Sequence, residues 1–132
     1  MKTSMYAAAL LAGVSCGAAS AAETGLTSRF ICATVEAMDC DAGTACFKGR
    51  PQDIGAPAFM RVDLDAKTIA GPNRTTPIVF MDKSSDGVQV LLQGTEIGFG
   101  WTMAIDMKAG TMATTLVNRE GAFVLFGSCT PL

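Results

Sequence analysis

The sequence contains no histidine, and its single tyrosine, Tyr6, falls within the first 22 residues. The absence of histidine excludes Ser-His-Asp and Cys-His nucleophilic systems, histidine general bases and most catalytic zinc sites. Only carboxylates, lysine, arginine, serine and threonine are left for catalysis, and no metal or cofactor motif is present. The composition therefore favours a non-catalytic protein, and a carboxylate-based hydrolase of cell-envelope sugars is the alternative enzyme.

Positive charge is also scarce, and it is not clustered. The 132 residues include 10 Lys and Arg against 12 Asp and Glu, for a net charge of −2. Nucleic acids and anionic membranes need a basic patch, so they are poor candidates for partners. The longest apolar run near the start, from about Met5 to Val14, is shorter than the ~20 residues that cross a bilayer.

The start of the chain has the layout of a secretory signal peptide. Lys2 precedes the apolar run, and small residues up to Ala22 suit a signal peptidase. We therefore expect residues 1–22 to be cleaved and residues 23–132 to form one periplasmic or secreted domain. A lipoprotein anchored through Cys16 is the alternative, although Gly13 stands where a lipobox usually has leucine.

Four cysteines would remain after cleavage: Cys32, Cys40, Cys46 and Cys129. An even number of cysteines in an exported chain of this size predicts two disulfides, for which three connectivities are possible.

Apolar and polar residues alternate along most of the mature chain, and Gly, Asn and Asp turns interrupt the pattern. The clearest case is 97–106, where large apolar residues occupy every second position. Such alternation predicts half-buried antiparallel strands. The segment 29–37 also has helical spacing, but its β-branched and aromatic residues favour a strand. The eight predicted strands cover 29–37, 59–65, 68–71, 77–81, 88–93, 97–106, 111–117 and 122–129.

Eight antiparallel strands in sequence order predict an all-β fold, a small up-and-down β-barrel that is closed or partly open. Closure would make the first and last strands neighbours and would place Cys32 beside Cys129. Cys40 and Cys46 would then form a local bridge. The long connection at about 38–57 would contain this bridge and a short helical turn near Pro51.

The interior of this barrel is the candidate binding site. If it holds a cavity, the cavity is apolar and suits a small hydrophobic ligand; if the core is solid, the outer surface would bind a protein or envelope partner. An accessory subunit of a larger envelope assembly is a further alternative. Ile97 continues the same apolar face. The predicted lining residues are Met60, Val62, Val88, Val90, Leu92, Phe99, Trp101 and Met103.

Acidic residues suggest other chemistry only weakly. Asp39 and Asp41 begin like an EF-hand loop, but Thr44 and Arg50 stand where that loop needs glycine and a bidentate glutamate. The stretch is better explained as a disulfide-stapled turn. Elsewhere, we expect Asp82 and Asp86 to serve a hairpin turn, and Asp63 and Asp65 to face solvent rather than flank a cleft. Glu96 has no partner visible in the sequence.

Overall fold

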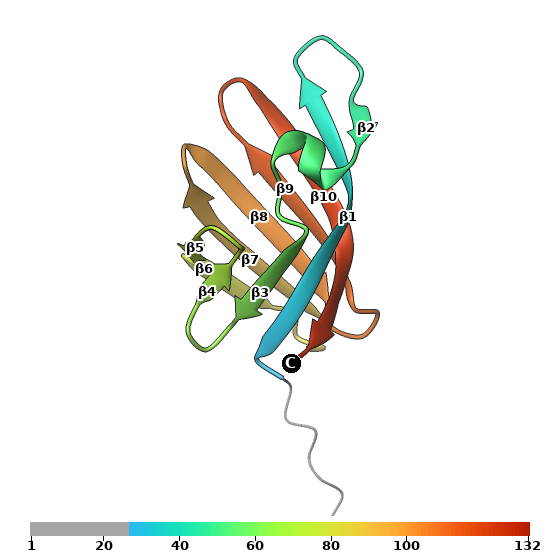
Figure 1. Ribbon diagram of the computed structural model, residues 1–132. Helices are drawn as coiled ribbons and strands as arrows, with labels where there is room; N and C mark the ends of the chain where they lie inside the picture. Colours follow the sequence, from blue (N-terminus) through green and yellow to red (C-terminus); the bar gives the residue numbers. More distant parts are fainter. Residues whose placement is uncertain (1–26) are drawn as a thin grey trace, which may run out of the picture.

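A computed structural model describes residues 27–132, so the predicted signal peptide and Cys16 lie outside the described residues. The fold is nearly all-β (Figure 1). No helix in the described part of the chain is long and apolar enough to span a membrane. The elements are β1 (Arg29–Asp41), β2 (Phe47–Gly49), the 3-10 helix η1 (Pro51–Ile54), β3 (Phe59–Asp63), β4 (Thr68–Ala70), β5 (Thr75–Pro77), β6 (Phe80–Lys83), β7 (Gln89–Glu96), β8 (Phe99–Asp106), β9 (Thr111–Val117) and β10 (Gly121–Pro131).

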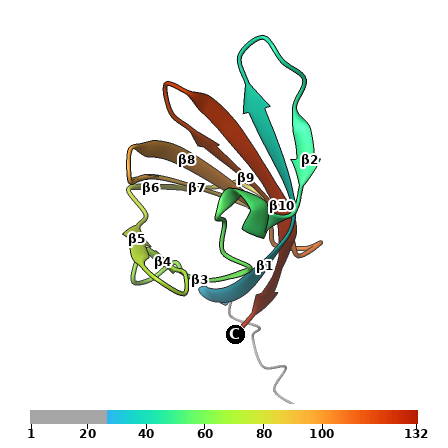
Figure 2. The same ribbon diagram turned by 45° about the horizontal axis from the view of Figure 1, so that its top comes forward.

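The strands form one antiparallel sheet in the order β5-β4-β3-β1-β10-β9-β8-β7-β6, and β2 pairs with β1 beside this path. The sheet curls into a half-barrel, and its strands surround a central axis in Figure 2. Strands that are adjacent in the sheet follow one another in the chain, apart from β1, which pairs with the last strand. The predicted up-and-down order is therefore confirmed, with nine strands on the path rather than about eight.

The additional strand comes from the segment 77–81, which was predicted as one strand. This extended stretch changes partners along its length: the Ile78 N–H donates to the Lys67 carbonyl, and the Val79 N–H donates to the Gln93 carbonyl. β5 thus ends beside β4 at Pro77, and β6 begins beside β7 at Phe80. The stretch connects the two edges of the sheet, and we call it the seam.

The first and last strands pair over almost their whole lengths, which brings Cys32 opposite Cys129. The structure contains the two predicted disulfides, Cys32–Cys129 and Cys40–Cys46. The β1–β10 ladder is interrupted by a bulge between Thr34 and Glu36. Gly127 opposes this bulge, and a Cβ there would lie 2.0 Å from the Ala33 carbonyl oxygen, so a larger residue cannot fit.

The connection predicted at 38–57 is more ordered than the sequence indicated. β1 continues to Asp41, and β2 returns beside it, so that the Cys40–Cys46 disulfide closes the hairpin between them. η1 then covers the predicted helical turn and buries Pro51. In Figure 2, η1 lies across one end of the half-barrel.

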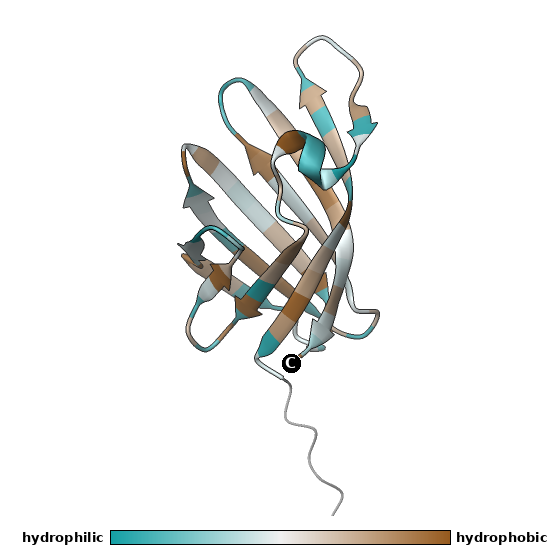
Figure 3. Cartoon of the chain, in the orientation of Figure 1, coloured by the Kyte–Doolittle hydropathy of each residue, from teal (hydrophilic) through white to brown (hydrophobic). Residues whose placement is uncertain are grey.

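The hydrophobic core fills the end of the half-barrel where β1 begins and β10 finishes. Cross-strand pairing joins Val90, Ile105 and Met112 into one inward row, and Val62 pairs with Phe30 and Ile69 on the opposite side. All six side chains are buried. Figure 3 shows hydrophobic bands along the strands, with hydrophilic residues at the turn between β9 and β10. We call this filled end, where Arg29 and the C-terminus lie, the closed end.

Candidate functional site

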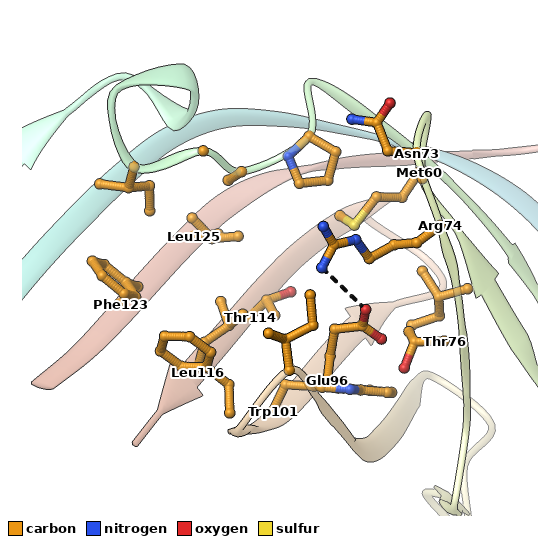
Figure 4. Close-up of a pocket in the computed structure, with 18 of the residues that line it drawn as sticks. Met60, Asn73, Arg74, Thr76, Glu96, Trp101, Thr114, Leu116, Phe123 and Leu125 are labelled. Carbon is orange, nitrogen blue, oxygen red and sulfur yellow. Dashed lines mark hydrogen bonds and ion pairs between the residues drawn. The ribbon is translucent and has the colours of Figure 1, made fainter. Parts of the chain in front are cut away.

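A cavity of about 580 Å³ occupies the other end of the half-barrel, which we call the open end. Ligand pockets in proteins typically measure about 300–1,000 Å³, so its volume suits one small molecule. Its wall combines the inner faces of β3 and β8–β10 with the loops that follow η1 and β4. Figure 4 shows these side chains around the pocket.

Two inward rows of side chains form the sheet side of the cavity. Register pairing places Phe123, Leu116 and Trp101 in the row nearer the mouth, on β10, β9 and β8. The next row, toward the closed end, consists of Leu125, Thr114 and Met103. All six residues line the cavity, and five of them are apolar. The wall is therefore mainly aliphatic and aromatic.

Short strands and small residues leave the space open on the opposite side. β3 begins only at Phe59, and the residues before it belong to the loop that follows η1. Ala58 continues the inward face of Met60 and Val62, but its methyl group is too small to fill the interior. The cavity thus exists because long strands face short ones whose inner positions carry little volume.

Trp101 closes the wall near the seam by covering a glycine on the neighbouring strand. Gly94 is its register partner, and a Cβ at Gly94 would lie 2.4 Å from the indole ring and 2.8 Å from the Pro77 carbonyl oxygen. The ring can lie over β7, close to β5, only because position 94 has no side chain. Trp101 is 6% exposed and is the only tryptophan of the chain, so its fluorescence reports on this site.

An ion pair at the rim of the cavity joins the loop before β5 to the end of β7. Arg74 Nη1 lies 3.4 Å from Glu96 Oε1 (Figure 4). Nearby, the Thr76 hydroxyl donates a 3.3 Å hydrogen bond to the Thr95 carbonyl. Both charged side chains are partly exposed, so the pair contributes less than about 1 kcal/mol to stability. It leaves the rim electrically balanced and places one cation and one anion beside an apolar space.

Two wall residues carry buried polar atoms that have no hydrogen-bond partner within 27–132: Trp101 Nε1 and Thr114 Oγ1. An unpaired buried donor or hydroxyl destabilises a fold by about 1–3 kcal/mol. Such atoms are uncommon, and two of the three in this part of the chain belong to the cavity wall. Both residues line the cavity, and the two polar atoms themselves are buried.

The structure divides the predicted lining residues into two groups. Met60, Phe99, Trp101 and Met103 line the cavity, together with Ile97. Val62, Val90 and Leu92 belong to the buried core and do not line the cavity, whereas Met60, Trp101 and Met103 belong to both. Val88 is half-buried in the turn before β7.

The residues that sequence reasoning missed are of two kinds. Leu116, Phe123 and Leu125 follow the same alternation as the predicted residues, so the pattern of β9 and β10 could have identified them. Arg74 could not be found in this way, because it is separated from Glu96 by 22 positions and lies in an irregular loop. The fold alone brings these two charges together.

Three of the acidic residues considered above, Asp63, Asp65 and Asp86, accept hydrogen bonds within the protein. Asp63 accepts a hydrogen bond from the Ala66 N–H at 2.8 Å, and Asp65 accepts one from the Ser28 hydroxyl. Asp86 caps the turn between β6 and β7, where hydrogen bonds from the Ser84 hydroxyl and a backbone N–H lower the pKa of its carboxyl. Among residues 27–132, no group of three or more Cys, Asp or Glu could hold a metal ion.

No protein-family model, curated protein or solved structure matches this chain. The geometry of the cavity therefore carries the functional argument.

Proposed function

We propose that this protein is an exported, non-catalytic binding protein that takes one small hydrophobic or amphipathic molecule into the open end of its half-barrel. The observation that carries the proposal is the cavity of about 580 Å³ with its mainly apolar wall. A small number of polar groups in an apolar pocket is the usual arrangement of a small-molecule site. The apolar part of the ligand would contact the two inward rows, and a polar end would reach Arg74 and Glu96 at the rim.

Two further observations support the class of protein and its compartment. Among residues 27–132, Glu96 is the only carboxylate in the cavity wall. A glycosidase-type site, by contrast, uses two carboxyl groups that flank the substrate. Two disulfides fit an oxidising compartment, which agrees with the signal-like start of the chain and a periplasmic or secreted location. A protein or envelope partner on the outer surface is the other predicted class; it stays a prediction.

Binding can be tested through Trp101, which no other tryptophan obscures. The purified, oxidised protein is titrated with N-phenyl-1-naphthylamine, an uncharged apolar fluorophore that can accept energy from an excited indole. We expect quenching of Trp101 and saturation at one molecule per protein. Ala58→Phe fills the cavity from the β3 side and should weaken binding at least tenfold, because the phenyl ring occupies the volume that the probe needs.

Ala66→Phe is the matched control. Ala66 is exposed in the turn between β3 and β4, at the closed end, so the same substitution there should leave binding unchanged. Far-ultraviolet circular dichroism of each variant checks that the sheet is intact. Equal affinity of folded Ala58→Phe and wild-type protein would overturn the proposal, as would the absence of saturable binding by the wild type.

A further inference from the structure

The turn between β7 and β8 contains a residue in an unfavourable backbone conformation. Only Ile97 and Gly98 separate the two strands, and both have positive φ, 45° and 79°. Two positive φ values define a type I′ turn, which strongly prefers Asn-Gly, Asp-Gly or Gly-Gly. Gly98 fits this preference. Ile97 does not, because a β-branched side chain in the left-handed region clashes with its own backbone.

Packing within the protein does not compensate for this conformation. The side chain of Ile97 is 70% exposed, so the fold recovers little of the free energy that burial of an isoleucine provides. Yet Ile97 belongs to the wall of the cavity and stands at its mouth, next to Glu96. An apolar residue is thus held in an unfavourable conformation at a position where a molecule in the cavity could cover it.

We infer that Ile97 is a ligand-contacting residue that sets specificity for an apolar group at the mouth of the cavity. This inference rests on the proposed function. A bound molecule long enough to reach the mouth would bury the Ile97 side chain against its apolar part, beside the Arg74–Glu96 pair. Strained residues concentrate at ligand-binding sites, where the strain is retained for function. The ligand class implied is an elongated molecule whose apolar portion extends to the rim.

The chain offers a matched comparison in Lys67, the other non-glycine residue with positive φ among residues 27–132, at 53°. Lys67 precedes β4 in the turn at the closed end, is exposed and does not belong to the cavity wall. Its backbone conformation is therefore similar, while its distance from the proposed ligand is large.

The experiment compares Ile97→Asn and Lys67→Asn in thermal unfolding of the ligand-free protein and in titration with N-phenyl-1-naphthylamine. Asparagine tolerates the left-handed region, so Ile97→Asn should raise the unfolding midpoint by roughly 2–6 °C, and Lys67→Asn should raise it less. Ile97→Asn should weaken binding about tenfold, since it removes part of an isoleucine's apolar contact. Lys67→Asn should bind as tightly as wild type. Ile97→Val, which keeps an apolar β-branched side chain, should stay within about threefold of wild type.

Several results would contradict the inference, and they are separable from failure of the proposed function. Wild-type affinity in Ile97→Asn would show that position 97 does not contact the ligand, while the cavity could still bind it. A lowered unfolding midpoint in Ile97→Asn would show that isoleucine is not strained there. Equal loss of affinity in Lys67→Asn would indicate a general effect on the fold. Absence of saturable binding in the wild type would overturn the proposed function itself.

Discussion

The closed and open ends of this half-barrel belong to the same sheet and follow the same alternation, yet one is filled and the other is hollow. At the closed end, the row of Val90, Ile105 and Met112 faces further apolar side chains across the interior. At the open end, the row of Trp101, Leu116 and Phe123 faces loops and small residues instead. The difference shows that alternation determines which side chains point inward, whereas strand length on the opposite side determines whether they meet.

One disulfide lies in the filled core and the other lies outside it. Their removal should give the largest changes in the free energy of unfolding. Cys32–Cys129 lies in the core cluster and links residues 97 positions apart, while Cys40–Cys46 closes a six-residue separation in the hairpin beyond the core. Without its disulfide the unfolded chain gains conformational freedom. The double variant Cys32→Ala/Cys129→Ala should therefore lose about 4–5 kcal/mol of the free energy of unfolding. The same estimate gives about 2 kcal/mol for Cys40→Ala/Cys46→Ala.

Urea denaturation of the two double variants measures both costs. Equal destabilisation of the two double variants would show that the two disulfides contribute equally to stability, which would contradict the prediction. Wild-type protein under the same oxidising conditions is the reference, and unchanged far-ultraviolet circular dichroism at low urea shows that each variant starts from the folded state.

The second prediction compares a filled position with one that borders the cavity, through two leucines on the same inward row. Leu92 pairs with Met103 at one side of this row, and Leu125 pairs with Thr114 at the other. Leu92 is 0% exposed and Leu125 is 3% exposed, but only Leu125 lines the cavity. Leu92→Ala should cost about 3–4 kcal/mol, because it opens a new void in a filled core. Leu125→Ala should cost roughly 1–2 kcal/mol less, because the space that it vacates joins an existing cavity instead of forming a separate void. Chemical denaturation measures both values, and a larger loss at Leu125 would mean that the open end is packed as tightly as the core.

The smallest expected effect concerns the charges at the rim. Glu96→Gln leaves Arg74 without its carboxylate partner, so the mouth becomes cationic. The affinity ratio for a fatty acid over the fatty alcohol of equal length should then rise about threefold, as for other exposed charge pairs. Arg74→Gln is the opposite change and should lower that ratio. Displacement of the bound fluorophore measures both ratios, and no change in either variant would place the polar end of the ligand away from this rim.

Most of the fold was predictable because half-buried strands carry a two-residue period that the sequence shows directly. The Cys32–Cys129 pairing followed from closure, which requires the first and last strands to be neighbours. The seam was not predictable in detail, because the change of partners at Ile78 and Val79 occurs within one extended segment. A hydrophobicity pattern records burial, and it does not record which strand provides the hydrogen bonds.

The site was less predictable than the fold. Alternation continues through Ile97, so the sequence placed it in a strand, whereas the structure places it in the turn before β8. The volume of the interior depends on how small residues such as Ala58 face long ones across the barrel, and the sequence alone does not show these pairs. Arg74 and Glu96 come together only through the seam.

Native mass spectrometry of the oxidised protein, purified from the cells that make it, tests the central claim most directly. If the open end takes a small apolar molecule, the wild type should carry one copy of a small organic adduct, and folded Ala58→Phe should lose it while Ala66→Phe keeps it. Bare protein in all three samples, including after incubation with a lipid extract of those cells, would contradict the account.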